Sequence, residues 1–564
     1  MARTVSIGIQ DFAKIRENNS FYVDKTSLIK EWWIKNDDVT LITRPRRFGK
    51  TLNMSMLNCF FSNKYANRSD LFEGLEIWKD ETFHSLQGTY PVLFLSFADV
   101  KHTDYSTTRA SLNAIIADLC RPYEKLLENE IFSDTDRNNF YAINRDMDDS
   151  VASRSLKQLC EWLSRYYGKK CIILLDEYDT PMQEAYVNGF WNELAAYTRA
   201  LFNSTFKTNP YLERAIMIGI TRVSKESIFS DLNNLNVVTT TSNEYATAFG
   251  FTEAEVFAAM DEQGITCNEQ EYIRKWYDGF TFGQTTDIYN PWSITMYLDK
   301  KKFDAYWANT SANGLVGKII RESDRQIKED FEKLLNGESI EAVIDEQIIF
   351  DQLDGNRDAI WSLLLASGYL KVEKIIQECP EDNAVYVLRL TNFEVQKMFS
   401  RMISGWFAKD DSFGEFLSAM FAGDVRVMNH YMNRIALNTF SYFDAGSKPS
   451  EAAEPERFYH GFVLGLIVDK AKDYIVKSNR ESGFGRYDVV MEPKNPSDVA
   501  IIMEFKVLDN YDGENELVDT AANALKQIEE KKYETDLLEK GVSAEKIYKY
   551  GFAFEGKKCL IAKA

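Results

Sequence analysis

Residues 39–57 read VTLITRPRRFGKTLNMSML, and this stretch decides the fold of the first part of the chain. The apolar run 39–43 predicts a buried strand, residues 44–49 predict a tight cationic turn, and Lys50 opens a helix. Gly49, Lys50 and Thr51 match the second half of the phosphate-binding loop pattern, in which the lysine lies beside the β- and γ-phosphates and the hydroxyl holds Mg²⁺. The free N–H groups at the start of the helix favour the same anion.

The full pattern has a glycine five positions before Gly49, and this sequence has Arg44 there. Gly49 still supplies a permissive backbone beside the phosphates. The candidate nucleotide-binding residues of the turn are Arg47, Phe48, Gly49, Lys50 and Thr51, and Thr51 is also a candidate Mg²⁺ ligand. An accidental junction between a turn and a helix is the alternative interpretation of so short a motif.

The segment 171–179, CIILLDEYD, strengthens the nucleotide-binding interpretation. Its apolar run, which ends in acids, predicts a central parallel strand whose carboxyl end meets solvent. Asp176 then lies where a carboxylate can hold Mg²⁺ through water, and Glu177 lies where one can polarise an attacking water. Asp176 is therefore a candidate nucleotide and metal residue, and Glu177 a candidate catalytic residue. A strand end with two solvated acids is the alternative.

The apolar run 215–220 predicts a further strand, with Thr221 and Arg222 at its end. In P-loop ATPases with an added strand between the two motif strands, a polar residue here contacts the γ-phosphate or positions water. Thr221 could have this role, and Arg222 could reach a phosphate or a neighbouring subunit. A homo-oligomer is therefore possible. An ordinary junction between a strand and a loop is the alternative.

The chain has 564 residues, of which 45% are hydrophobic, so we expect roughly three or four domains with sizeable cores. No apolar run approaches the roughly 20 residues of a membrane span, and the N-terminal sequence MARTVSIGIQDF lacks the apolar core of a signal peptide. The seven cysteines are scattered without a CxxC pair, which argues against disulfides and zinc. These features predict a globular, cytoplasmic protein with no membrane partner.

The net charge of −20 argues against a protein that coats nucleic acid, because phosphate binding depends on Lys and Arg. Residues 1–60 differ, since they carry ten basic and six acidic side chains. An aromatic and apolar lead-in, residues 7–35, contains a helix that Thr26 is predicted to cap. We favour a structural helix there, although the lead-in is also the nearest apolar wall for an adenine. The long segment 104–167 and residues 191–206 have helical periodicity.

Several of these motifs together resemble one bacterial family. VDKT at 23–26, RPRRFGKT at 44–51, LLDEYD at 174–179, ITRVSKESIFSDLNNL at 220–235 and YDGFTFGQTTDIYNPWSI at 277–294 are similar to the AAA-ATPase-like domain family. The resemblance covers about the first 300 residues and implies a P-loop ATPase core that uses ATP and Mg²⁺. The absence of an NKxD guanine signature also favours ATP over GTP.

Residues 295–445 are mostly helical by periodicity. Within them, AIWSLLLASGYLKV at 359–372 and AVYVLRLTNFEV at 384–395 predict a helix, a turn and a β-hairpin, the outline of a winged-helix or lid module. Basic residues are sparse on this helix, so we expect it to transmit nucleotide state rather than to bind DNA. Residues 446–456, GSKPSEAAEPE, predict a linker.

The last 110 or so residues contain a second set of charged residues. A helix is predicted over 456–475, and GRYDVVME at 485–492 and VAIIMEFKV at 499–507 predict a hairpin. A turn centred near 495 or 496 puts Asp488 opposite residues 502–504. The strand period of two puts Glu504 and Lys506 on one face.

Two carboxylates and an ammonium on one hairpin suggest metal-dependent hydrolysis. Asp488 and Glu504 are the hard oxygen ligands that Mg²⁺ prefers. Lys506 could orient or deprotonate the attacking water, so phosphodiester hydrolysis is the natural reaction. The pattern resembles the PD-(D/E)xK nuclease fold, and the resemblance implies Glu456 as a third metal ligand and Gln527, in the helical ALKQIEEKKY, as a further catalytic residue. It extends to the terminal strand pair YKYGFAFEGKKCLIA.

Other interpretations of this set remain open. A Glu504–Lys506 or Asp488–Lys506 ion pair could belong to a fold that has lost activity. Glu530, in a second E-x-K match, lies in a run of charges at helical spacing and is better interpreted as a solvated helix face. His460 is favoured as a structural histidine.

We therefore expect an α/β protein with a P-loop NTPase core at 1–294, a helical and winged-helix-like lid region at 295–445, and a restriction-endonuclease-like α/β domain at 446–564. The first hypothesis is an ATPase with a Mg²⁺-dependent nuclease that acts on nucleic acid, with DNA favoured. The second is an ATP-driven regulatory switch whose C-terminal domain binds a partner or nucleic acid without cleaving it.

Overall fold

The structure, a computed structural model, describes residues 2–220, 228–229, 232–307, 316–317, 319–320, 325–345, 356–377, 379, 381–407, 412–443, 454–470, 472–480, 487–508, 514–532, 534–555 and 558–564. The chain divides into two compact units, the first with residues 1–311 and 341–395 and the second with residues 312–340 and 396–564. The predicted lid region thus contributes to both units. The predicted linker lies outside the described residues as far as residue 453.

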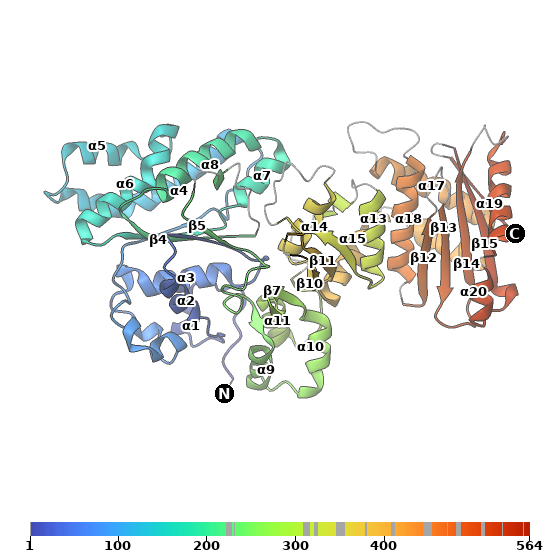
Figure 1. Ribbon diagram of the computed structural model, residues 1–564, viewed down its shortest axis with the longest axis horizontal. Helices are drawn as coiled ribbons and strands as arrows, with labels where there is room; N and C mark the ends of the chain where they lie inside the picture. Colours follow the sequence, from blue (N-terminus) through green and yellow to red (C-terminus); the bar gives the residue numbers. More distant parts are fainter. Residues whose placement is uncertain are drawn as a thin grey trace. The chain divides into compact units, whose positions relative to one another are not determined.

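A five-stranded parallel sheet forms the centre of the first unit (Figure 1). Its strands are β1 (Val39–Thr43), β2 (Val92–Ser96), β3 (Cys171–Asp176), β4 (Leu212–Gly219) and β5 (Leu235–Val238). Their order is β2-β3-β4-β1-β5, so β4 lies between the two motif strands β1 and β3. The three predicted strands are confirmed as β1, β3 and β4. Every residue of β1 and β3 is buried, in keeping with their continuous apolar runs.

Helices cover both faces of this sheet (Figure 1). One side carries α1 (Phe12–Glu17), α2 (Ser27–Lys35) and α3 (Lys50–Phe61). The other carries α4 (Tyr105–Cys120), α5 (Asp134–Ala142), α6 (Asp149–Tyr167) and α8 (Trp191–Phe206). α7 (Thr180–Asn188) follows β3 after a short turn. The helices predicted in 104–167 and 191–206 are confirmed.

The predicted cap at Thr26 is wrong in its chemistry. Thr26 holds the N-cap position of α2, but no hydrogen bond from its side chain caps the helix. Its backbone is already helical (φ −68°, ψ −12°), whereas a capping side chain needs an extended backbone. The hydroxyl instead donates to Asp24 Oδ1 at 2.7 Å and accepts the backbone N–H of Ile77 at 3.1 Å.

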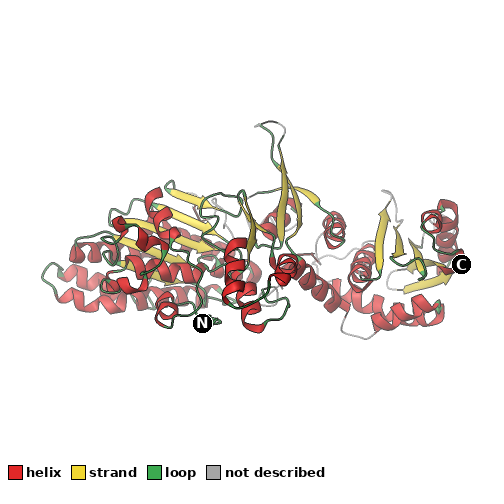
Figure 2. Cartoon of the chain, turned by 90° about the horizontal axis from the view of Figure 1, so that it is seen from below, coloured by secondary structure: helices red, strands yellow, loops and turns green. Residues whose placement is uncertain are grey.

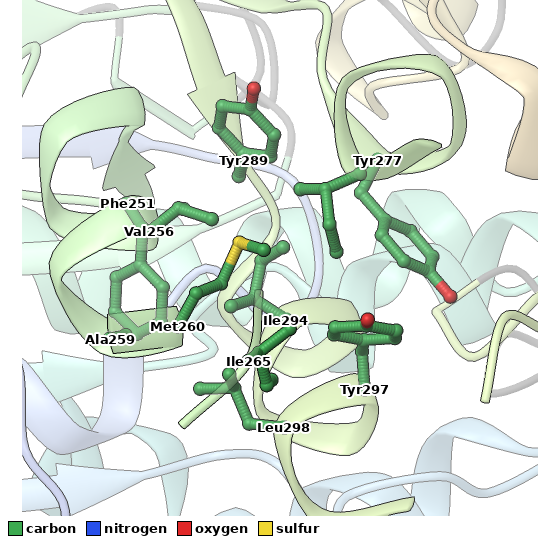
Figure 3. Close-up of a cluster of buried hydrophobic side chains, with 11 residues drawn as sticks. Phe251, Val256, Ala259, Met260, Ile265, Tyr277, Tyr289, Ile294, Tyr297 and Leu298 are labelled. Atoms are coloured by element: carbon green, nitrogen blue, oxygen red, sulfur yellow. The ribbon is translucent and has the colours of Figure 1, made fainter. Parts of the chain in front are cut away.

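A smaller helical subdomain follows β5 in the first unit. It contains β6 (Phe251–Thr252), α9 (Glu253–Glu262), α10 (Gln270–Tyr277), β7 (Phe280–Phe282), β8 (Thr285–Tyr289) and α11 (Pro291–Lys300). Buried side chains that include Val256, Tyr277 and Ile294 form its core (Figure 3). The side chain of Asn290 caps α11 by accepting from the N–H of Trp292 at 2.9 Å. The subdomain therefore fixes the start of α11.

The predicted helix and hairpin are confirmed as α14 (Arg357–Ala366), β10 (Leu370–Ile376) and β11 (Val385–Leu390). A third strand, β9 (Ile340–Val343), pairs with β11 and was not predicted within this mostly helical region. Ile340 and Ala342 are buried and Glu341 between them is exposed, which is the period of a strand. Four residues are too few to reveal that period in the sequence.

The second unit is built on a mixed five-stranded sheet (Figure 2). Its strands, in spatial order, are β12 (Tyr474–Arg480), β13 (Tyr487–Pro493), β14 (Ala500–Val507), β15 (Ile547–Glu555) and β16 (Lys558–Lys563). Only the β14–β15 pair is parallel among them. The predicted hairpin and the terminal strand pair are confirmed.

Helices make up the rest of the second unit. They are α13 (Arg325–Leu335), α16 (Ser412–Ala422), α17 (Val425–Phe443), α18 (Glu454–Lys470), α19 (Leu517–Lys531) and α20 (Glu534–Glu539), with α15 (Phe393–Phe407) beginning in the first unit and continuing into the second. The helix predicted over 456–475 is too long, because Tyr474 and Ile475 pair with β13 as part of β12.

Alternate residues of β14 face different helices. Ala500 and Ile502 pack with Ile528 of α19, whereas the ring of Phe505 lies 5.8 Å from that of Phe462 on α18. Since successive side chains of a strand point to opposite faces, α19 covers the even-numbered face of β14 and α18 the odd-numbered face. Glu504 and Lys506 thus share the face that α19 covers, as predicted.

Two further contacts hold helices against this sheet. Asn429 of α17 donates to the carbonyl of Ile561 at 2.9 Å and accepts its N–H at 2.8 Å, so the helix pairs with the edge strand β16 and covers it. On α13, Glu332 accepts the hydroxyl of Ser478 in β12 at 2.7 Å. Burial raises the pKa of Glu332 to about 8.

Candidate functional site

The phosphate turn lies between the end of β1 and the start of α3, as the sequence predicts. Gly49 has φ +79°, in the left-handed region that favours glycine. A Cβ there would meet nothing within 4 Å, so the backbone conformation, not space, is what requires glycine. The turn therefore delivers Lys50 and Thr51 at the first turn of the helix.

Arg44 takes the place of the first glycine and has a structural role that the sequence did not indicate. Its side chain is fully buried. The guanidinium donates to the carbonyls of Thr239 at 2.7 Å and Glu244 at 3.1 Å, and its carbon lies 4.5 Å from the ring centroid of Phe282. Arg44 therefore ties the phosphate turn to the chain that follows β5.

Lys50 is buried inside the turn. Its ammonium donates to the carbonyls of Arg44 at 3.2 Å and Pro45 at 3.0 Å. It also lies 3.7 Å from Oε1 of Glu177. A phosphate bound at the turn would compete with these oxygens for the ammonium, so nucleotide binding and the position of Glu177 are linked.

Thr51 and Asp176 bring the two motifs together. The Thr51 hydroxyl donates to Oδ2 of Asp176 at 2.7 Å, across 125 positions of sequence. Asp176 is 1% exposed, and within the described part of the chain its Oδ1 atom is buried without a hydrogen-bond partner. Burial raises the pKa of Asp176 to about 6, although the Thr51 hydroxyl opposes this shift.

These oxygen donors fit a magnesium ion. A hydroxyl and a carboxylate with an unused oxygen are the hard ligands that Mg²⁺ takes alongside water and phosphate. Glu177 follows Asp176 in a left-handed conformation with φ +51°, which is uncommon for a residue other than glycine. Its side chain is 22% exposed and lies at the cavity described next.

A cavity of about 450 Å³ opens at the turn. Its walls come from the phosphate turn, the acidic end of β3, the lead-in 6–10 and 21–23, and the start of α11. The predicted residues that line it are Arg47, Phe48, Gly49, Lys50, Thr51, Asp176 and Glu177. Thr221 and Arg222 lie outside the described residues.

Two predicted nucleotide residues make strong contacts with the protein itself. Phe48 is buried, with its ring centroid 4.8 Å from that of Phe280. Arg47 has φ +65°, and its guanidinium lies 4.4 Å from the ring centroid of Trp292. Trp292 lies in the motif at 277–294, but nothing in the sequence places it beside Arg47, because α11 is far from the turn in the chain.

The second candidate site lies on the α19 face of β14. The register pairs Asp488 directly with Glu504, inside the predicted window, so the two residues share one face of the sheet. Glu504 is fully buried, and its Oε1 accepts from Nε2 of Gln527 at 2.5 Å. The structure therefore brings Gln527 to Glu504, as the resemblance implies.

Gly551 makes this contact sterically feasible. It is the partner of Glu504 on the parallel strand β15. A Cβ at this position would come within 2.5 Å of the backbone oxygen of Ala521 in α19. The absence of a side chain therefore lets α19 approach the sheet closely.

The remaining residues predicted for the nuclease site are Lys506, Asp488 and Glu456. Lys506 is half-buried on the same face of β14 as Glu504. The side chains of Asp488, Glu456 and His460 lie outside the described residues. Within the described part of the chain, no group of three or more His, Cys, Asp or Glu side chains is placed to hold a metal ion. Glu530 is 65% exposed and pairs with Lys526, as expected for a solvated helix face.

One further carboxyl group lies near α19 and was missed in the sequence. Glu514 is 5% exposed and accepts from Thr520 at 2.6 Å and from Asn523 at 2.7 Å. Both donors belong to α19, the helix that carries Gln527. Glu514 precedes that helix and has no apolar run before it, so sequence pattern alone could not distinguish it from a loop acid.

Comparisons with known proteins find a family match over each of the two regions that carry the candidate sites. Residues 6–229 match the family model described as "Predicted AAA-ATPase", and residues 454–564 match the model of the PD-(D/E)XK nuclease superfamily. An uncharacterized protein in the vnfD 5′ region of Azotobacter chroococcum mcd 1 is 26% identical over 399 residues, which cover 70% of this chain and 68% of that protein. In the portion of the chain with described coordinates, no helix is both long and apolar enough to cross a membrane.

Proposed function

Because the chain joins an AAA-ATPase-like domain at residues 6–229 to a PD-(D/E)XK nuclease superfamily domain at residues 454–564, we propose that it hydrolyses ATP and cleaves nucleic acid with Mg²⁺. The observation that carries the ATPase half is the hydrogen bond between Thr51 and Asp176. It unites the phosphate turn with the acidic strand end at a cavity of nucleotide size. We propose DNA as the nucleic acid.

In the ATPase site the chain's own residues have distinct roles. Lys50 would exchange the carbonyls of the turn for the β- and γ-phosphates, and Thr51 and Asp176 would hold the metal ion. Bound Mg²⁺ neutralises charge on the phosphate oxygens. Glu177 orients the water that attacks the γ-phosphate and accepts its proton, once phosphate has replaced its contact with Lys50.

In the nuclease site the register of β13 and β14 supports the following proposed roles. Asp488 and Glu504 would hold Mg²⁺, which supplies a polarised phosphate oxygen and an activated water when bound. Gln527 keeps the Glu504 carboxylate in one orientation through its amide N–H. Lys506, on the same face, positions the attacking water.

The direct test is a cleavage and turnover assay with the full chain. We expect plasmid or single-stranded DNA to be cut with Mg²⁺ or Mn²⁺, and ATP to be hydrolysed by the wild type but not by Lys50→Ala, because the variant lacks the ammonium that binds the phosphates. Phosphate release and gel analysis measure the two activities. Cleavage of RNA alone would correct the substrate, and wild-type protein without either activity would contradict the proposal.

A second function, an ATP-driven switch, is favoured by a specific set of contacts. The backbone carbonyl of Arg46, in the phosphate turn, accepts from Nε1 of Trp307 at 3.0 Å. The backbone N–H of Trp307 donates to Oε1 of Glu394 at 2.5 Å, and Glu394 lies in the first turn of α15. α15 continues into the second unit. A movement of the phosphate turn could therefore be transmitted to the second unit along this helix.

We expect Trp307→Phe to separate ATP binding from its effect on the second unit. The phenyl ring can still pack on Phe280, although it is smaller than the indole, and it lacks the N–H that donates to Arg46. ATP affinity should stay within about twofold, while any ATP-dependent change in DNA binding or cleavage should fall severalfold, since one hydrogen bond contributes about 1 kcal/mol. Filter binding with and without ATP measures this. An unchanged ATP response in the variant would remove the proposed route.

A further inference from the structure

The phosphate turn carries three arginines, and the structure gives them different surroundings. Arg44 is buried and donates to backbone carbonyls. Arg47 is stacked on Trp292. The Arg44 guanidinium is thus occupied by the protein itself, and the exposed Arg47 guanidinium lies over an aromatic ring. Arg46 differs from both, because its guanidinium lies beside the side chain of Gln183.

The side chain of Arg46 is held weakly. It is half-buried, and its Nη2 donates to Oε1 of Gln183 at 3.5 Å, the long limit of a hydrogen bond. Among the described residues it forms no ion pair. Its backbone, by contrast, is fixed, because its carbonyl accepts from Asn290 at 3.2 Å and Trp307 at 3.0 Å. A fixed backbone with a loosely held cation is suited to binding an anionic ligand.

Arg46 also lies at the cavity beside the phosphate turn. It lines the same 450 Å³ space as Lys50, Thr51 and Asp176. Arg46 precedes Lys50 by four positions, so it belongs to the loop that surrounds the phosphates. A guanidinium binds two phosphate oxygens at once through its planar fork, and it would exchange a weak neutral contact for a charged one.

Gln183 is positioned to orient Arg46. Its Nε2 donates to Oδ2 of Asp179 at 3.0 Å, which leaves its oxygen for Arg46. The same Oδ2 accepts the backbone N–H of Ile220, at the end of β4, at 3.0 Å. Asp179 is fully buried. The end of β4, the acidic loop after β3 and the phosphate turn are therefore joined through one glutamine.

We propose that Arg46 binds the γ-phosphate of ATP from within the same chain, and that Gln183 is its positioning residue. The inference rests on the proposed ATPase function. During hydrolysis the bond between the γ-phosphorus and the bridging oxygen breaks, and ADP leaves with the electron pair of that bond. The oxygen of the attacking water forms the new bond to the γ-phosphorus, and Glu177 accepts a proton from that water. Arg46 stabilises the negative charge on the transferred group, as an arginine finger does.

The test measures affinity as well as turnover, with full-length protein and Mg²⁺. Calorimetry with ADP and with ATPγS gives the contribution of the terminal phosphate. We expect Arg46→Ala to weaken the binding of ATPγS by roughly ten- to a hundredfold, because a charge-assisted contact is lost. The affinity for ADP should not change. Turnover should fall on the order of 10³-fold. Arg46→Lys, which keeps the charge without the fork, should lie between the two.

Three further variants sharpen the assignment. Arg154 is an exposed arginine on α6, so Arg154→Ala should change neither affinity. Gln183→Ala should weaken ATPγS less than Arg46→Ala, and the double variant should be no weaker than Arg46→Ala alone, because the glutamine acts through the arginine. Arg47→Ala should change the two affinities by the same factor, since its guanidinium is stacked on Trp292.

Several results would overturn the inference. If Arg46→Ala weakens the binding of ADP and of ATPγS by the same factor, Arg46 has a structural role. If the variant still prefers ATPγS as strongly as the wild type does, Arg46 does not contact the γ-phosphate. Loss of that preference in Arg47→Ala alone would assign the role to Arg47. A wild-type protein that binds neither nucleotide would overturn the ATPase proposal itself, which separates the two failures.

Discussion

Nucleic acid cleavage should be lost in the Glu504→Gln variant while ATP turnover stays at the wild-type rate. Glu504 is fully buried on the α19 face of β14, opposite Asp488. An amide there can still accept from Gln527, so packing and the hydrogen bond persist while the negative charge disappears. A metal ion contributes several kcal/mol to the transition state, so cleavage should fall on the order of 10³-fold.

The chain offers a matched control for this variant. Glu530→Gln removes a carboxylate with the same local E-x-K pattern, but Glu530 is 65% exposed on the solvated side of α19. Its cleavage rate should equal that of the wild type. Gel assays with Mg²⁺ and Mn²⁺ measure both variants, and calorimetry with Mn²⁺ should show weaker metal binding only in Glu504→Gln. Cleavage that survives in Glu504→Gln would exclude this face as the active site.

The central strands of both sheets could be predicted because each is a long apolar run with a motif at its end. β1, β3 and β14 are buried along almost their whole length, so composition alone marks them. β5 and β9 could not be found this way, since they are four residues long and only partly buried. Short strands depend on the neighbours they pair with, and those neighbours are distant in sequence.

The helix end near Lys470 illustrates the same limit. Periodicity favours helix through Ile475, but the edge of the sheet needs another strand, and β12 forms by pairing Tyr474 and its successors with β13. Tertiary pairing thus overrides a local preference. The register of the next hairpin was predictable because its turn residues and its two apolar flanks agree.

Spacing identified which residues reach the phosphate turn but not what each one does there. The sequence places Arg44, Arg46 and Arg47 in one turn, and their different contacts come from the packing of residues that follow much later in the chain. Arg44 lies under Phe282 and Arg47 on Trp292, residues more than 200 positions away in the chain. Roles that depend on such contacts require the structure.

Replacing Asp176 with asparagine should stabilise the nucleotide-free protein and abolish its ATP turnover. Burial raises the pKa of Asp176 from 3.8 to about 6, so the folded state holds this proton more tightly than the unfolded chain does. Wild-type stability therefore falls as pH rises from about 4 to 6, by about 3 kcal/mol in all. Asparagine carries no charge and avoids this loss. The variant should melt several degrees higher at pH 7.5 and at nearly the same temperature below pH 4.

When nucleotide and Mg²⁺ are added at pH 7.5, the wild type should melt at a higher temperature than Asp176→Asn. The buried carboxylate that is unfavourable in the free protein becomes favourable beside a divalent cation, because the cation compensates its charge. A ligand at a hundred times its Kd adds about 2.7 kcal/mol to the wild type, and the variant should gain little of it. Thermal melts across pH, with and without Mg²⁺ and ATPγS, measure both halves. A variant that is less stable than the wild type without nucleotide, or equally stabilised with it, would show that Asp176 is a structural acid, not a metal ligand.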